Sequence, residues 1–112
     1  MPALSTLPAE RHIDRSKMDD YLLHPVKGRG KAAFFQAFGF ALGRWEELRD
    51  ALLDQAAAGT VLSEAVSPYG RRYTVSGTLQ TPSARNPQPV VCTGWQADNG
   101  ASGVRLITAH PA

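Results

Sequence analysis

The period of the hydrophobic pattern changes near the middle of the chain. Up to about residue 59, apolar residues recur at steps of three and four, which is typical of amphipathic helices. From about residue 60, β-branched and apolar residues alternate with polar ones or form short runs, and this pattern indicates β-strands. The sequence therefore predicts helices first and a sheet afterwards.

Three helices are expected in the first half, over residues 17–23, 31–38 and 44–57. Pro25 ends the first helix, because the residue before a proline avoids helical backbone angles. Gly39 is well placed as a left-handed cap after the second helix, and Gly59 ends the third. Residues 1–13 show no clear period and are predicted to form an extended N-terminal arm.

Four strands are expected in the second half, over residues 60–67, 71–80, 90–98 and 104–110. In the second of them, Tyr73 and Val75 share one side, whereas Arg72 lies on the other. Short connections, such as the turn at Asn99-Gly100, favour an antiparallel meander. Because so small a sheet needs a cover, we predict an α+β fold in which about three N-terminal helices pack on one face of a roughly four-stranded antiparallel meander sheet.

Composition sets the class of protein but not its activity. The chain has 112 residues, so a single α+β domain over residues 14–112 is expected after the arm. The net charge of +2 is too mild to indicate nucleic-acid binding by itself. Cys92 is the single cysteine, which excludes an intramolecular disulfide, and its apolar neighbours predict a buried thiol. No membrane span or secretory signal is visible, so a cytoplasmic protein is expected.

The most distinctive stretch is a cationic glycine loop just before the second expected helix. Lys27, Arg29 and Lys31 stand within five residues and are spaced by Gly28 and Gly30. A helix start already carries about half a positive charge and unpaired N–H groups, so each added cation costs roughly 0.3–1 kcal/mol there. A bound phosphate would relieve that cost. The alternative interpretation is a flexible, solvated connection, and the spacing of a P-loop is missing.

The histidines offer a second kind of chemistry. His24 lies beside the cationic loop, where positive charge favours the neutral imidazole that suits a general base. The alternative is an exposed histidine that ends a helix. Since His12, His24 and His110 lack the spacing of a helical metal pair, neither a metal nor another cofactor is expected.

A third candidate is the sheet face that the helices leave open. Thr93 and Trp95 share a face at strand spacing, and Trp95 is expected in the core. Thr108 is expected on the face opposite to Arg105. A row of cations and hydroxyls on the open face, with Arg71-Arg72 as a second cationic patch, would cradle an RNA backbone. The alternative is an ordinary hydrated strand face.

Three segments of the chain resemble an uncharacterised bacterial domain family. They are residues 17–23 (KMDDYLL), 24–35 (HPVKGRGKAAFF) and 105–111 (RLITAHP). The family shows patterns like KLxxYLLNxxHPxGxxKAxFF, GFxxxxWxxLxxxL, GxxYxVxGxLxxPxG and VRTxWxxxxGxxxPRLVTAYP, and the resemblance runs from about residue 13 to 111. Its members look like C-terminal modules of polymorphic-toxin and phage-associated proteins.

The resemblance implies a reaction and a set of site residues. Helices followed by a meander are similar to the barnase/EndoU/colicin/RelE-like ribonuclease superfamily, which implies RNA cleavage without a metal. By position, the resemblance implies a site made of His24, Lys31, Thr93, Arg105 and Thr108. His24 or Lys31 would transfer protons, Arg105 and Lys31 would bind the phosphate, and Thr108 would donate a hydrogen bond to it. RNA or another phosphate-bearing ligand is the implied partner, together with a cognate protein of the immunity or antitoxin type, and the relatives include secreted toxin modules.

The sequence departs from the family pattern at three positions. Cys92 replaces the usual arginine before Thr93, Gly94 stands where a β-branched residue is common, and His110 replaces a tyrosine. The missing cation at Cys92 weakens the ribonuclease interpretation and keeps two alternatives open. One is a non-catalytic module that binds a protein or a nucleic acid. The other is an assembly domain of a phage or mobile element, with the apolar strand 61–66 as an edge contact.

Overall fold

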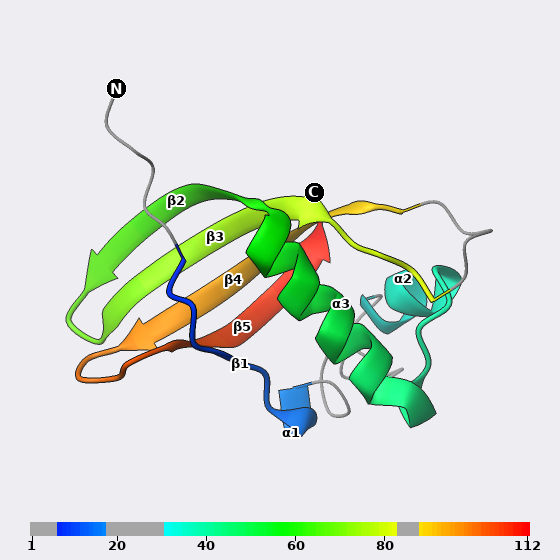
Figure 1. The fold of residues 1–112 in the computed structure, drawn as a ribbon, viewed down its shortest axis with the longest axis horizontal. Coiled ribbons are helices and arrows are strands. Elements are labelled where there is room, and N and C mark those ends of the chain that lie inside the picture. The colour runs from blue at the N-terminus through cyan, green and yellow to red at the C-terminus, as the bar shows by residue number, and fades with distance from the viewer. Residues whose placement is uncertain (1–6, 18–30, 83–87) are drawn as a thin grey trace.

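The chain folds as an α+β domain in a computed structural model (Figure 1). The structure describes residues 7–17, 31–82 and 88–112. For Lys17, Lys31 and Leu42 it describes the backbone alone. The helical elements are α1 (Arg15–Lys17), α2 (Lys31–Ala37), the 3-10 turn η2 (Leu42–Arg44) and α3 (Trp45–Ala58). The strands are β1 (Arg11–His12), β2 (Thr60–Ser67), β3 (Gly70–Thr78), β4 (Val90–Asp98) and β5 (Val104–Pro111). None of the helices in these ranges is long and apolar enough to cross a membrane.

The sheet has five strands in the order β1-β5-β4-β3-β2. The antiparallel meander of β2 to β5 confirms the predicted strands. The prediction of a four-stranded antiparallel sheet is wrong at one edge, where β1 pairs in parallel with β5 and makes the sheet mixed. A strand of two residues is too short to show an alternating pattern. Leu7 is also buried in the core, so the segment expected to be an arm contributes both a strand and a core side chain.

Two of the expected helices are present close to their predicted bounds. After α2, Gly39 adopts a φ of 98°, its N–H donates to the carbonyl of Gln36, and the N–H of Phe40 donates to that of Phe35. This is the Schellman arrangement that a glycine favours, and it confirms the predicted cap. The expected helix over 17–23 lies outside the described residues except for Lys17, which belongs to α1.

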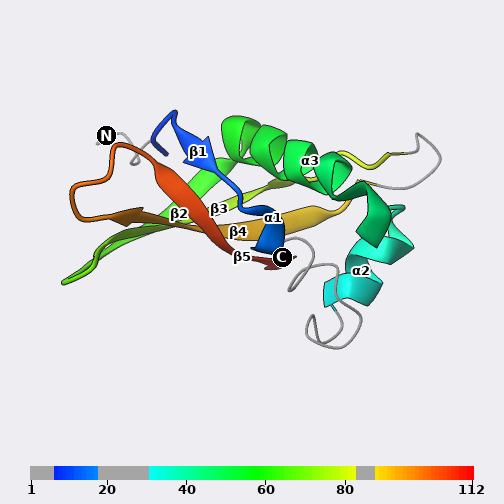
Figure 2. The ribbon, with the colours of Figure 1, turned by 90° about the horizontal axis from the view of Figure 1, so that it is seen from below.

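Helix α3 covers one face of the sheet (Figure 2). Its buried side chains Leu48 and Leu52 belong to the same core cluster as Val75 and Trp95 of the strands. The predicted division of β3 is also confirmed, because Tyr73 and Val75 are buried whereas Arg72 is exposed. The described part of the chain is therefore a two-layer domain, with α3 on one side and a largely polar strand surface on the other.

A buried hydrogen-bond network joins α3 to the centre of the sheet. Gln55 of α3 is 1% exposed, and its Nε2 donates to the carbonyls of Val75 at 3.2 Å and Val91 at 3.0 Å. The Thr93 hydroxyl donates to Gln55 Oε1 at 2.9 Å and accepts from Trp95 Nε1 at 2.8 Å. Each of these polar groups has a partner, so the network orients the helix without the penalty of an unsatisfied buried group.

One extra residue in β5 changes which side chains share a face. Gly94 pairs with Thr108 and Gln96 pairs with Arg105, so two steps along β4 correspond to three along β5. The additional residue, Ile107, forms a β-bulge there. Arg105 and Thr108 consequently lie on the same face of the sheet. The prediction that they lie on opposite faces is wrong, because strict alternation assumes a strand without a bulge.

Candidate functional site

The face of the sheet opposite α3, which we call the open face, carries a polar row that crosses the strands in register. The row runs through His12, Arg105, Gln96 and Arg72 and continues to Ala65 of β2. Neighbouring strands lie about 4.8 Å apart, so these side chains stand next to one another. We call this set the cross-strand row.

Two further rows of small polar residues lie beside the cross-strand row. One contains Thr108, Gly94, Thr74 and Ser63, and the other contains His110, Cys92, Ser76 and Thr60. Apart from Gly94, all of these residues are exposed or half-buried. Cys92 is half-buried on this face, whereas the sequence predicts a buried thiol. The open face therefore presents hydroxyl and imidazole groups beside two arginines.

Arg72 lies against the surface of Gly94. A Cβ atom built on Gly94 would stand 3.6 Å from Nη2 and 3.8 Å from Nε of Arg72, and 3.0 Å from Cγ2 of Thr108. A side chain at this position would crowd Thr108, whereas the guanidinium of Arg72 would lie at an ordinary van der Waals distance from it. The missing side chain of Gly94 thus avoids a close contact with Thr108 and leaves Arg72 packed over the backbone of β4. Arg72 is exposed, and the ion pairs of the described residues do not include it.

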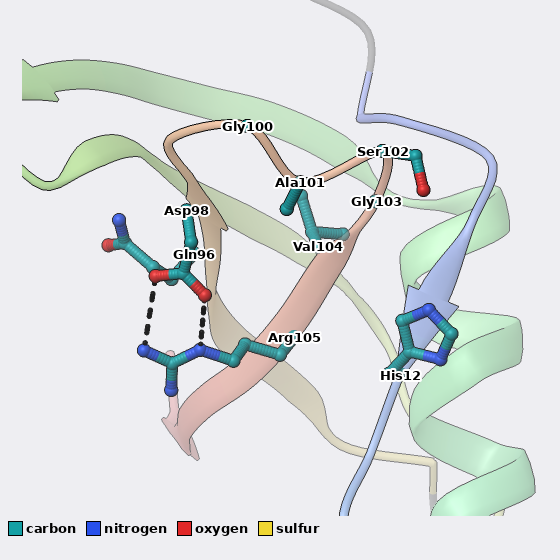
Figure 3. A pocket seen from close by; sticks show the side chains of 9 residues that line it. All are labelled: His12, Gln96, Asp98, Gly100, Ala101, Ser102, Gly103, Val104 and Arg105. Carbon is teal, nitrogen blue, oxygen red and sulfur yellow. Dashed lines mark hydrogen bonds and ion pairs between the residues drawn. The ribbon is translucent and has the colours of Figure 1, made fainter.

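Arg105 is held by an ion pair with Asp98 (Figure 3). Nε and Nη2 of Arg105 donate to the two carboxylate oxygens at 2.8 Å and 3.3 Å. These hydrogen bonds lower the pKa of Asp98 and raise that of Arg105. Both side chains are about half exposed, at 45% and 51%. A bound anion would therefore compete with the Asp98 carboxylate for the guanidinium of Arg105.

A pocket of about 380 Å³ lies at one end of the cross-strand row, between His12 and the β4–β5 turn (Figure 3). His12 Nε2 is 3.2 Å from Oε1 of Glu10, whose other oxygen accepts a hydrogen bond from Ser102. The Ser102 and His12 contacts lower the pKa of Glu10. Gln96 also lines the pocket, and its Nε2 is buried without a hydrogen-bond partner among the residues that the structure describes. The pocket thus combines an imidazole, a guanidinium and an unsatisfied amide donor.

The structure places the predicted site residues in three different settings. Arg105 and Thr108 lie together on the open face. Thr93 is on the other face and is 0% exposed, and its hydroxyl makes hydrogen bonds inside the core, so it is not accessible to a ligand on the open face. Lys31 begins α2, but its side chain is outside the described part. The remaining predicted residues, His24, Lys27, Gly28, Arg29 and Gly30, also lie outside the described residues.

Sequence reasoning did not assign His12 and Gln96 to the site. His12 reaches the open face only because β1 pairs with a strand more than ninety positions later in the chain, with His12 opposite Arg105. No local pattern signals that pairing. Gln96 could have been found, because it is two positions from Gly94 in an alternating strand. In residues 7–17, 31–82 and 88–112, no group of three His, Cys, Asp or Glu side chains could hold a metal ion.

The fold and the open face define an α+β domain with a mixed sheet whose side opposite α3 carries arginine, histidine and hydroxyl groups. A family model described as a domain of unknown function, DUF6883, matches residues 7–112, and the chain belongs to that family. The matched range starts at Leu7, inside the segment that the sequence pattern predicted to be an arm. No match is found among curated proteins or among solved structures.

Proposed function

We propose that the domain binds a single strand of RNA across its open face and cleaves it without a metal ion. The observation that carries this proposal is the cross-strand row, in which two arginines, a glutamine and a histidine are neighbours in register. Arginines attract the phosphate backbone, and hydroxyl and amide groups donate to phosphate oxygens and base edges.

The spacing of the two arginines suits an extended ligand. One strand separates Arg105 from Arg72, so their backbones are about 10 Å apart. Thr74 and Ser76 supply hydroxyl groups beside this line, and Thr108 stands next to Gly94 within the same surface. A strand of RNA that crosses the sheet would meet both guanidinium groups and several hydrogen-bonding groups at once.

Cleavage is assigned to the end of the row that holds His12. The ionised Glu10 carboxylate orients the imidazole, and Arg105 is its neighbour across the strands. His12 would remove the proton from a ribose 2′-hydroxyl, whose oxygen attacks the adjacent phosphorus while the bond to the 5′-oxygen breaks. The 5′-oxygen takes a proton from water, and the hydroxide that remains takes the proton from His12, which restores the neutral imidazole. Arg105 stabilises the charge that develops on the phosphorane. The products are a 2′,3′-cyclic phosphate and a 5′-hydroxyl.

Neutralising Arg72 tests the binding surface. We expect Arg72→Gln to weaken binding of a single-stranded oligoribonucleotide at every sequence and to reduce the slope of log K against log salt by about one. Fluorescence anisotropy at several salt concentrations measures both quantities. Arg44→Gln is the matched control, since Arg44 is an exposed arginine at the start of α3 rather than on the sheet. Equal losses in the two variants, or no binding by the wild type, would overturn the proposed surface.

Replacing His12 tests the reaction. In the presence of EDTA the wild type should cleave the oligoribonucleotide, and His12→Asn should reduce the rate by about 10²–10⁴ while leaving binding within a few-fold. Arginine and hydroxyl contacts remain in this variant, so the two readouts separate chemistry from affinity. A folded wild type that binds RNA but releases no cyclic phosphate would remove the catalytic half of the proposal. That result would favour the non-catalytic binding module instead.

A further inference from the structure

Strand β2 forms one edge of the sheet, and beyond its bulge at Leu62 it carries no lysine or proline. It pairs with β3 on its inner side, and no described strand pairs with its outer side. The opposite edge, β1, has two residues, whereas β2 has eight. Natural edge strands are commonly short, or carry lysine or proline that blocks further pairing. In β2 the sole charged residue is Glu64, and Arg71 neutralises it with an ion pair of 2.6 Å.

Most of the exposed large apolar side chains lie along the same edge. Among the described residues, the large hydrophobic side chains that are exposed are Leu62 at 57%, Val66 at 73%, Tyr69 at 78% and Val90 at 51%. Leu62 and Val66 belong to β2, and Tyr69 belongs to the turn that follows it. Unpaired backbone groups and apolar side chains therefore coincide on one edge, which favours the addition of another strand.

We propose that this edge pairs with the same edge of a second copy of the chain, antiparallel and centred on Ala65. In that register Ala65 faces its own counterpart, Ser63 faces Ser67, and Glu64 faces Val66, so no two like charges oppose each other. The bulge at Leu62 falls outside this regular segment. Leu62 would then meet the Pro68-Tyr69 turn of the second copy, and the exposed apolar groups would cover each other.

Continuity of the open face also points to a second copy. Ala65 is the β2 member of the cross-strand row, next to Arg72. A two-fold axis at Ala65 joins the two rows end to end into one polar row that runs from one His12 to the other. The small Ala65 side chains leave that junction flat. The dimer itself does not depend on the RNA proposal, because backbone pairing and apolar contacts form it.

The size of the contact predicts a weak dimer. An eight-residue strand spans roughly 26 Å, and one strand pair buries less area than the roughly 800 Å² per partner of a standard stable interface. We therefore expect a monomer at low micromolar concentration and a growing dimer fraction at high micromolar concentration in sedimentation velocity. Val66→Lys should raise the dissociation constant at least about tenfold. Val90→Lys is the matched control, because Val90 is exposed on β4, which is an inner strand.

A disulfide tests the register. In a Cys92→Ser background, Ala65→Cys should oxidise to a covalent dimer, because opposite residues of antiparallel strands have Cα atoms about 4.5–5.5 Å apart. Ser67→Cys, on the same strand and face, should not form this disulfide. In the proposed register the two copies of residue 67 are displaced from each other by about four residues along the strands. Thermal unfolding verifies that each variant is folded. A chain that stays monomeric at all concentrations, a dimer that survives Val66→Lys, or equal cross-linking at both positions would overturn the proposal.

Discussion

Replacing Trp95 with alanine is expected to lower the free energy of unfolding by about 3–5 kcal/mol. The indole is 0% exposed at the centre of the core, so its removal leaves a large cavity under α3. The Thr93 hydroxyl would also lose the hydrogen bond from Nε1. Urea unfolding followed by circular dichroism measures the change. A loss of this size is a large part of the stability of a small domain.

Trp45 supplies the control for this experiment. It lies half-buried at the start of α3, with the guanidinium of Arg49 4.9 Å from the centroid of its ring. Trp45→Ala should therefore cost clearly less than Trp95→Ala. If the alanine variant at Trp95 does not fold, Trp95→Phe retains most of the buried area and should show an intermediate loss. Equal losses at the two tryptophans would contradict the assignment of Trp95 to the centre of the core.

The second large effect is expected from Thr93→Val, at about 2–4 kcal/mol of unfolding free energy. Valine has nearly the shape of threonine but no hydroxyl, so Trp95 Nε1 and Gln55 Oε1 would both lose a buried partner. Each buried polar group left without a hydrogen bond costs about 1–3 kcal/mol. Denaturant unfolding measures this loss, and RNA affinity of the folded variant should stay at the wild-type value.

Thr93→Ser separates the hydroxyl from the methyl group. Serine keeps the hydrogen-bonding oxygen, so this variant should lose about 1 kcal/mol or less, from the smaller buried apolar area. A Thr93→Val variant that is as stable as Thr93→Ser would show that the network is dispensable. Weaker RNA binding by folded Thr93→Val, with stability preserved, would instead return Thr93 to the ligand site that the family resemblance implied.

The regular part of the fold could be predicted from the sequence because period and burial agree there. Leu48 and Leu52 lie at a helical step of four, and Tyr73 and Val75 lie at a strand step of two. Each pair is buried on the expected side. Gly39 could be predicted for a similar reason, since a left-handed residue after a helix is a local requirement. These elements depend on neighbours in sequence, which a single chain displays directly.

The candidate site was harder to predict because it depends on distant pairings. The parallel pairing of β1 brings His12 beside Arg105, and the bulge at Ile107 turns Arg105 and Thr108 to the same face. Neither feature can be recognised from a hydrophobic period. Strand β1 has only two residues, and the alternation in β5 is interrupted by the bulge. For Thr93, strand alternation and family resemblance conflicted. Alternation placed it beside the core residue Trp95, and the structure agrees with alternation.

The parallel pairing of β1 with β5 also bears on how the molecule forms during its synthesis. Arg11 leaves the ribosome long before Val104, its partner across the two strands. Until β5 is released, the backbone of β1 has no partner strand, whereas α3, β2 and β3 adjoin one another in the chain and can associate early. Pairing between such distant residues is slow to form, because a long loop must close first. The nascent domain therefore remains open along one side until its last strand has been translated.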